Sequence, residues 1–374
     1  MKALALGLTL LLASCRERVT PSPVDAGVVV PADAGAVVSA ALFHEARPGP
    51  GLLLEVADAG FGLVFSSERS GAPHLHRWDG VEERALTSGP AAVHLQAVAS
   101  RTHEALVALV EGPAEHLLAV QLDDGGVRVV APPMEKAHGA VLSFDELDVV
   151  FEASLTHAAG LAVVSFDGRS APRPIAAPGE TGSFQPAFTL DRRVLFTNSS
   201  TGDPEVYVQP LDGGPPTQLT AFHLEDFGAV PAPDGQRFAF VSNREGSDRV
   251  FVQRLDGRGV ARLMSEKRGT DDTERDPVWM PDGRSILVTV KAGAESRIAR
   301  VDVTTHKTVW TSVGPGNEQL PRPSRDGRFI AFVSDRAGNA DVFVMRANGS
   351  DTTAVTSHAS AEYGPLWFDS ARGR

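Results

Sequence analysis

The chain has few of the residues that would support disulfides, aromatic clusters or a membrane-spanning helix. Its 374 residues contain one cysteine, Cys15, so no disulfide can form within the chain and its stability must come from a packed core. Aromatic residues make up 6% of the chain and hydrophobic residues 42%, which predicts a core rich in valine, leucine and alanine. The N-terminal apolar run, Ala3 to Ala13, is too short to span a bilayer as a helix.

Positive charge and catalytic motifs are also scarce. Acidic residues outnumber basic ones 47 to 35, and the basic residues are scattered, so a nucleic acid is not an expected partner. The chain has no Gly-x-Ser-x-Gly elbow, no His-Glu-x-x-His motif and no Walker loop. Its Asp-Gly pairs stand singly, without the alternating acids of a calcium loop, and are interpreted as turns. We therefore expect no catalytic residue, no metal site and no cofactor.

One pattern of turn, strand, polar turn and strand recurs along the chain. Its clearest copy is RDGRFIAFVSDRAGNADVFVM at 325–345, where Asp-Gly favours a turn and the β-branched and aromatic runs favour strands. Further copies lie at 60–80, 144–168, 190–214, 233–257 and 281–302, and a hidden copy lies at 104–126. The equivalent residues of the first strand are Phe65, Phe151, Phe196, Phe240, Val288 and Phe332, with a position near Ala108 for the hidden copy.

The repeats predict an all-β fold. Seven units with a period of about 45 residues and four short strands each are typical of propeller blades. We therefore expect residues 51–374 to form a seven-bladed β-propeller of four-stranded antiparallel blades. In one blade the inner strand is expected at Pro277–Met280, followed by strands at 285–290, 297–302 and near 308–312.

Several segments of the repeats resemble a known family. The stretches PVWMPDGR, AFVSDRAGNADVFVMRANGS and VYVQPLDGGPPTQLT are similar to the TolB-type, WD-like β-propeller repeat of bacterial envelope proteins. The resemblance covers residues 184–368 and fades over 52–183. It implies a propeller fold, but it says little about function, because propellers perform many unrelated tasks.

Two segments compete for the strand that closes the ring. Residues 363–368 read as an inner strand without a blade after it, and Leu52 to Val56 could take the same place. The C-terminal segment is favoured because its Pro-x-Trp, starting at Pro365, matches the Pro-x-Trp that starts at Pro277. The competing segment would then add to the edge of the last blade.

The N-terminus has the features of an export signal. Residues 1–14 combine a positive start, an apolar middle and small residues, and Leu12 to Cys15 resembles the bacterial lipobox. That resemblance implies a lipid on Cys15, and Arg16 after it implies sorting to the outer membrane. Residues 15–50, rich in Pro, Ala and Gly, are expected to form a tether, although 27–31 could instead form a strand.

Candidate binding residues lie just before the inner strands. Four histidines recur there at about multiples of the repeat, and acids occupy neighbouring or equivalent loops, so we expect these loops to surround the mouth of the central channel. Such a mouth could bind a cation, a metal or a basic peptide. The alternative is that these residues only turn the corner between blades. The candidates are His94, His138, His223, His358, Glu225, Asp226, Glu274, Glu318 and Glu362.

Two functions remain open from the sequence. The first is a lipid-anchored, monomeric scaffold in the periplasm or at the cell surface, which binds envelope proteins or basic peptides. It rests on the lipobox, the tether, the repeats and the missing catalytic motifs. The second is an enzyme, a polysaccharide lyase or a hydrolase, that uses the histidines and acids at the channel mouth.

Overall fold

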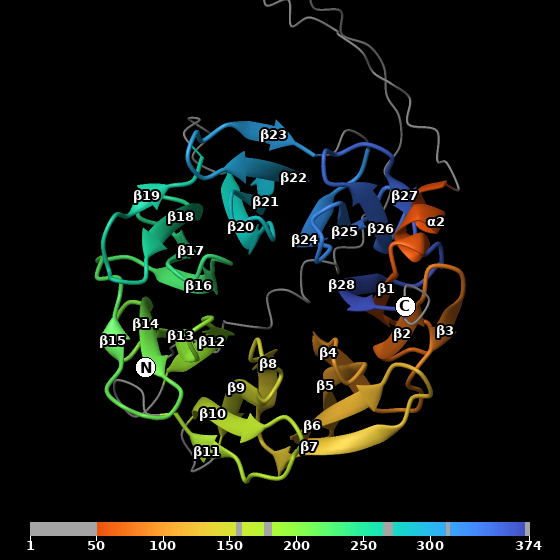
Figure 1. Cartoon of the computed structure of the whole chain (residues 1–374), viewed down its shortest axis with the longest axis horizontal. Coiled ribbons are helices and arrows are strands. Elements are labelled where there is room, and N and C mark those ends of the chain that lie inside the picture. Colours follow the sequence, from red (N-terminus) through yellow and green to blue (C-terminus); the bar gives the residue numbers. More distant parts are fainter. Residues whose placement is uncertain (1–50, 155–158, 176–181, 265–271, 312–314, 371–374) are drawn as a thin grey trace, which may run out of the picture. The chain divides into compact units, whose positions relative to one another are not determined.

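The seven predicted blades are present and form a ring (Figure 1). The computed structural model describes residues 51–154, 159–175, 182–264, 272–311 and 315–370. The chain divides into two units, 1–45 and 46–374, and all described residues belong to the second. That unit contains one described helix, α2 (Gly51–Asp58), and strands β1 to β28 in seven four-stranded antiparallel sheets. The predicted all-β propeller is therefore confirmed.

The blades are numbered in chain order, each from the inner strand outwards. Blade 1 contains β28 (Glu362–Asp369), β1 (Phe61–Ser67), β2 (His74–Trp78) and β3 (Glu83–Ala85). Blade 2 contains β4 (Ala92–Ala99), β5 (Glu104–Glu111), β6 (Ala114–Gln121) and β7 (Val127–Met134). Blade 3 contains β8 (Ala137–Leu142), β9 (Asp148–Ser154), β10 (Ala159–Ser165) and β11 (Arg173–Pro174). Blade 4 contains β12 (Ser183–Phe188), β13 (Arg193–Asn198), β14 (Glu205–Pro210) and β15 (Thr217–Gln218).

The last three blades follow the same plan. Blade 5 contains β16 (Asp226–Pro231), β17 (Arg237–Ser242), β18 (Arg249–Arg254) and β19 (Ala261–Arg262). Blade 6 contains β20 (Thr273–Trp279), β21 (Ser285–Ala292), β22 (Glu295–Asp302) and β23 (Thr308–Trp310), close to the four strands expected there. Blade 7 contains β24 (Glu318–Pro323), β25 (Phe329–Ser334), β26 (Asp341–Arg346) and β27 (Thr353–Ala354).

The repeated apolar residue of each second strand forms the core of its blade. All six predicted positions, from Phe65 to Phe332, are fully buried, and so is Val107, the equivalent residue of the hidden copy in blade 2. Each lies opposite a residue of the third strand, as Phe332 does opposite Phe343, with ring centroids 5.8 Å apart. Because each blade packs both faces against its neighbours, the period of the sequence becomes the period of the core.

Each inner strand contains an irregularity at the same place. The pairing of all seven inner strands shifts register near their middle, as in a β-bulge. In six of them one residue has a positive φ, and where it is not glycine the backbone is strained. These residues are Gly139, Gln185, Gly228, Asp276, Leu320 and Gly364. The bulge turns backbone N–H groups away from the regular ladder, so they need other acceptors.

The C-terminal strand closes the ring, as predicted. Strand β28 pairs antiparallel with β1 and completes blade 1. The prediction for Leu52 to Val56 was wrong, because this segment is part of helix α2 and not a strand at an edge. Leu52 and Val56 are four residues apart, as a helical face requires, and Gly60, with φ 78°, ends the helix.

Helix α2 packs across the junction between blades 7 and 1 (Figure 1). Leu52 and Val56 are buried in a cluster that also contains Phe329 of blade 7 and Leu63 of blade 1. On the exposed side, the Arg346 guanidinium donates to both carboxylate oxygens of Glu55, at 2.9 and 2.6 Å. The helix therefore stabilises the point at which the ring is not covalently continuous.

The predicted signal peptide, lipidated Cys15 and tether lie in 1–50, outside the described residues. Across the described ranges, no helix combines the length and apolar character needed to cross a membrane.

Candidate functional site

Four of the predicted acids lie at the start of inner strands and are fully buried. Each forms an ion pair with an arginine. The pairs are Asp226 with Arg244, Glu274 with Arg262, Glu318 with Arg336 and Glu362 with Arg69. Three of these arginines belong to a Ser-x-Arg turn that follows the second strand of the same blade. Burial raises the pKa of Glu318 and of Glu274, against the effect of the neighbouring guanidinium groups. These carboxylates are thus engaged inside the blades.

The remaining loop residues do not converge with them. His223 is exposed and packs against the ring of Phe222, with centroids 4.5 Å apart. His358 is exposed on the loop before β28, where its backbone oxygen accepts a hydrogen bond from Asn339. The backbone N–H of Glu225 donates to the Asn243 side chain, which fixes the start of β16. Within the described ranges, no hydrogen bond or ion pair joins the side chains of these three residues to the buried acids.

His94 and His138 occupy equivalent places within the inner strands β4 and β8, rather than on the loops before them as expected. His138 lies between two carboxylates. Its Nδ1 donates to Glu115 Oε2 at 2.7 Å, and its Nε2 lies 3.6 Å from Glu152 Oε2. Glu115 Oε2 also accepts the backbone N–H of Ala137 at 2.7 Å. This group, Glu115, His138 and Glu152, is called the histidine clamp below.

The two histidines have opposite electrostatic environments. Hydrogen bonds to Glu115 and then to Glu152 raise the pKa of His138 to about 9, so its imidazole is positively charged at neutral pH. Burial lowers the pKa of His94, and the charge of His138 lowers it further. A protonated imidazole with both N–H groups facing carboxylates can neither remove a proton nor bind a metal. Within the described ranges, no three His, Cys, Asp or Glu residues are arranged to hold a metal ion.

The histidine clamp is part of a chain of contacts from blade to blade. Glu152 Oε1 accepts the backbone N–H of Gln185 in blade 4 at 3.0 Å, and Gln185 Oε1 accepts that of Gly228 in blade 5 at 3.0 Å. Gln96 in blade 2 likewise accepts the N–H of Ala140 in blade 3 at 3.1 Å. The backbone N–H groups that the bulges leave out of the ladder thus donate hydrogen bonds to side chains of the preceding blade.

The sequence analysis missed Glu115, Glu152 and Gln96, since it considered only residues at the blade corners. Glu152 could have been found, because it directly follows the repeated residue Phe151 in the second strand. Glu115 gives no such signal, since it reaches His138 from the third strand of another blade.

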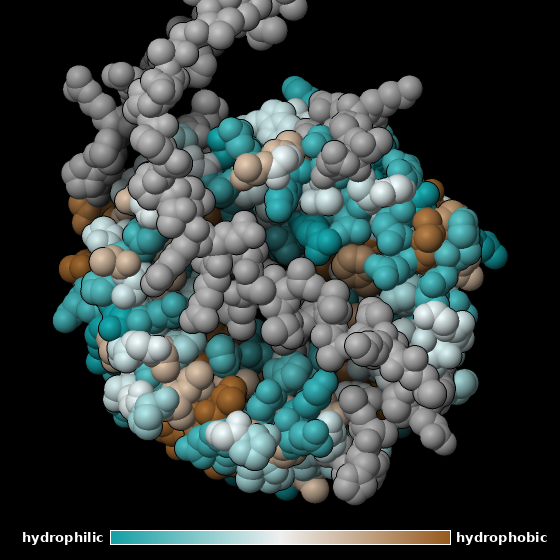
Figure 2. All heavy atoms as spheres, turned by 180° about the vertical axis from the view of Figure 1, so that it is seen from behind, coloured by the Kyte–Doolittle hydropathy of each residue, from teal (hydrophilic) through white to brown (hydrophobic). Residues whose placement is uncertain are grey.

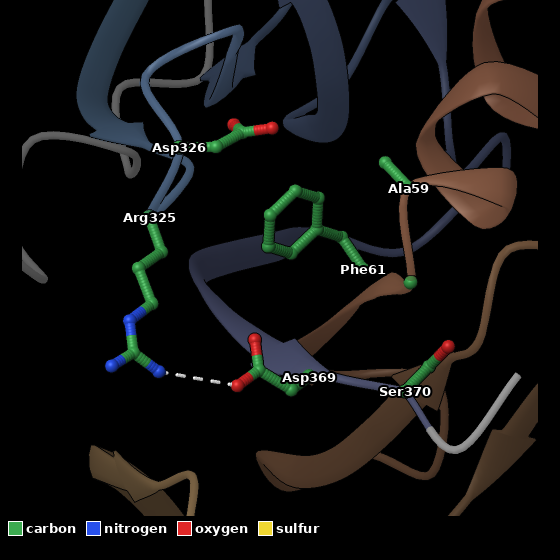
Figure 3. Close-up of a pocket in the computed structure, with 7 residues that line it drawn as sticks. Ala59, Phe61, Arg325, Asp326, Asp369 and Ser370 are labelled. Carbon is green, nitrogen blue, oxygen red and sulfur yellow. Dashed lines mark hydrogen bonds and ion pairs between the residues drawn. The ribbon is translucent and has the colours of Figure 1, made fainter. Parts of the chain in front are cut away.

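A cavity of about 410 Å³ lies where the ring closes (Figure 3). In other blades a short turn joins the inner strand to the second strand, and the Pro281 side chain of one such turn lies against Gly327 of the next. Blade 1 lacks this turn because β28 and β1 come from opposite ends of the chain. The cavity lies in its place, lined by Ala59, Gly60, Phe61, Arg325, Asp326, Asp369 and Ser370. At its rim, exposed Arg325 donates to Asp369 at 3.3 Å.

One face of the ring is largely polar (Figure 2). Hydrophilic residues predominate on the face of the ring shown in Figure 2, and hydrophobic residues form only small areas there. Such a surface is typical of a protein that binds through limited patches rather than through one large apolar face.

Comparisons of the sequence find one matching family model and several similar proteins. Residues 175–321 match the TolB β-propeller domain. The chain is 28% identical over 153 residues to a TolB homologue of Chlorobium luteolum, covering 41% of this chain and 34% of that protein. It is 30% identical over 135 residues to the Tol-Pal system protein TolB of Anaeromyxobacter dehalogenans, covering 35% and 29%. The chain thus spans about a third of the length of these relatives.

Comparisons of the structure agree on the fold. TolB of Acinetobacter baumannii superposes with a TM-score of 0.55 at 16% identity, over 83% of this chain and 67% of that one. A puromycin-hydrolysing peptidase of Mycobacterium tuberculosis superposes with a TM-score of 0.62 at 15% identity, over 81% and 54%. At these identities the likeness concerns the fold alone. The seven blades and the match over residues 175–321 together support a β-propeller of the TolB type.

Proposed function

We propose that this protein is a cell-envelope scaffold that binds other envelope proteins through one side of its propeller, and that a lipid on Cys15 holds it at the outer membrane. The sequence relatives named as Tol-Pal system proteins support a role in protein interaction. The hydrogen bond of His138 to Glu115 and the resulting rise of its pKa argue against a catalytic role for this histidine.

The observation that carries this proposal is a group of exposed apolar side chains on turns and strands that adjoin one another. In the described part of the chain, ten large hydrophobic residues are exposed, and five of them lie in blades 2, 3 and 4. These five, here called the apolar arc, are Val127, Val129, Phe144, Leu147 and Leu190. Clustered exposed apolar residues mark interaction sites more often than single ones do.

Contacts between the blades bring the apolar arc together. Gly168 of blade 3 lies against the Val129 carbonyl of β7, so closely that a Cβ there would be 2.4 Å from the oxygen. Gly168 lies in the segment between β10 and β11. This segment also contacts the β8–β9 turn, because the Phe166 N–H donates to the Leu147 oxygen at 2.8 Å. Arg192, two residues from Leu190, then forms ion pairs with two aspartates of the β8–β9 turn. The five side chains thus belong to adjoining turns and strands.

The charge of the protein indicates the chemistry of its partner. The chain carries a net charge of −12, so two copies repel one another at low salt. Exposed carboxylates accompany the apolar arc, including Asp123, Asp167 and Asp191. A partner segment with apolar side chains flanked by lysine or arginine would complement this surface.

Site-specific photocross-linking in the native envelope tests the surface. A photoreactive phenylalanine analogue at Phe144 or Leu190 is expected to give a discrete adduct whose yield falls as salt rises. The matched control is Val309, which is 43% exposed in blade 6, outside the apolar arc. Equal adducts at Val309 and Phe144, or adducts with a second copy of this chain alone, would refute the proposed surface.

The lipid anchor has a separate test. The membrane fraction should contain the wild type, whereas Cys15→Ser should be released into the soluble fraction, since the anchor accounts for membrane attachment. An unmodified N-terminus beyond Cys15, found by mass spectrometry, would contradict the anchor and leave the apolar arc unaffected.

A further inference from the structure

The inner strands present one set of equivalent residues just after the bulge. Each is the first residue after the bulge that pairs with the second strand. Its partner on the second strand directly precedes the repeated core residue of that strand. All seven are partly exposed, and the seven inner strands surround the centre of the ring (Figure 1). The seven residues are Ala97, Val141, Ala187, Val230, Val278, Arg322 and Leu366. Six are aliphatic, and Arg322 is the single charged member.

Arg322 has no anion bound to it among the described residues. Its guanidinium donates one hydrogen bond, from Nη1 to the Pro321 oxygen at 3.0 Å, and forms no ion pair within 4 Å there. The backbone oxygen of Arg322 accepts the indole N–H of Trp367 at 2.8 Å, which fixes the strand beside the next blade. Burial lowers the pKa of Arg322, as expected for a cation without a close partner. The remaining donors of the fork are free to bind an acceptor.

Asp276 affects the pKa of Arg322 but does not form an ion pair with it in the described residues. Asp276, at the bulge of the neighbouring strand β20, is near enough to affect the pKa of Arg322, yet the two groups form no contact within 4 Å in the described residues. Asp276 has φ 52°, so its backbone is strained at the bulge. Burial raises the pKa of Asp276 and Arg322 lowers it, so a second carboxylate beside Arg322 would compete with Asp276.

We propose that Arg322 anchors a binding site for a carboxylate-bearing ligand at the centre of the ring, and that Asp276 limits its affinity. A guanidinium presents paired N–H donors with the spacing of the two oxygens of a carboxylate. The aliphatic side chains at the six equivalent positions lower the local polarity, and a charged pair is stronger in such surroundings than in water. The site is separate from the apolar arc and does not depend on the proposed envelope partner.

Two sources could supply the carboxylate, the C-terminus of a peptide or a sugar acid, and paired probes distinguish them. The peptide Ac-Gly-Gly-Gly with a free carboxylate is compared with its C-terminal amide, and glucuronate is compared with glucose. Binding is measured by calorimetry and by the fluorescence of Trp367, which adjoins Arg322. At least one carboxylate is expected to bind while its neutral counterpart does not. Binding of the peptide indicates a peptide C-terminus as the ligand, and binding of glucuronate indicates a sugar acid.

Three variants test the roles of the named residues. Arg322→Gln should weaken carboxylate binding at least about tenfold, because a charge-assisted hydrogen bond is lost. Asp276→Asn should strengthen binding several-fold by removing the competing charge. Arg275→Gln is the matched control, since Arg275 lies on the same inner strand as Asp276 but is 56% exposed and paired with Asp248. Circular dichroism checks folding, and Arg322→Lys, which keeps the charge without the fork, serves if the glutamine variant unfolds.

The outcomes separate the alternatives. Equal binding of carboxylates and neutral analogues, or equal binding by the wild type and Arg322→Gln, overturns the proposal. Binding that occurs only in Asp276→Asn also overturns it, because Asp276 would then be the partner of Arg322 in solution. An unchanged cross-linking pattern at Phe144 in Arg322→Gln is expected in every case, so failure here leaves the envelope function standing.

Discussion

Replacing His138 should remove a pH-dependent part of the stability of the propeller. In the folded protein two carboxylates raise the pKa of His138 from 6.5 to about 9. A group whose pKa is raised on folding contributes stability that is fully present below its unfolded pKa and is lost as the pH rises through its folded pKa. Each unit of pKa difference between the folded and the unfolded protein corresponds to about 1.4 kcal/mol. The contribution of His138 to the free energy of unfolding is therefore on the order of 3 kcal/mol at pH 6. Little of it remains at pH 9.5.

Urea unfolding of the wild type and of His138→Gln at pH 6 and pH 9.5 measures this contribution. The free energy of unfolding should differ between the two proteins by about 3 kcal/mol more at pH 6 than at pH 9.5. Comparing them at each pH removes the effects of other titrating groups. The control His223→Gln replaces an exposed histidine on a loop and should show no such difference. An equal difference between wild type and His138→Gln at both pH values would refute the reasoning.

Three further substitutions test how the ring is held together. Leu52→Ala, at a residue 3% exposed under α2, should lower the free energy of unfolding by about 2–5 kcal/mol in urea, whereas Leu54→Ala, 56% exposed, should change it little. Glu318→Ala removes a fully buried carboxylate from its ion pair with the partly buried Arg336 and should lower the unfolding midpoint by an amount equivalent to about 3–5 kcal/mol. Gly349→Ala should destabilise more than Gly202→Ala in thermal melts. Both glycines have positive φ, but only at Gly349 would a Cβ meet backbone, 2.0 Å from an oxygen.

Most of the fold was predictable because the same pattern of turns and strands occurs seven times in the sequence. The buried position of Phe332 and its equivalents, and the pairing of β28 with β1, follow from residues that each blade repeats. The match between the two Pro-x-Trp segments has a structural reason as well. The indole N–H groups of Trp279 and Trp367 both donate to backbone oxygens of the preceding blade, at 3.1 and 2.8 Å.

The errors came from features that a repeat does not determine. A short apolar run such as Leu52 to Val56 suits a strand or a helix equally, and only its packing at the junction of two blades decides for the helix. The acids of the inner strands were found, but the arginines that pair with them lie on other elements, three of them in the turn after the second strand of the same blade, and were not predicted. Similarly, the environment of His138 depends on Glu115, which belongs to another blade.

The shared blade has a consequence for how this protein is made. Ser67 of β1 donates to Glu362 of β28, a residue 295 positions later in the chain, at 3.3 Å. Synthesis proceeds from the N-terminus, so the hairpin of β1 and β2 keeps one edge unpaired until β28 has been translated. A product that ends before β28 would leave that edge open to pairing with other chains. The ring therefore closes only in a product that includes β28.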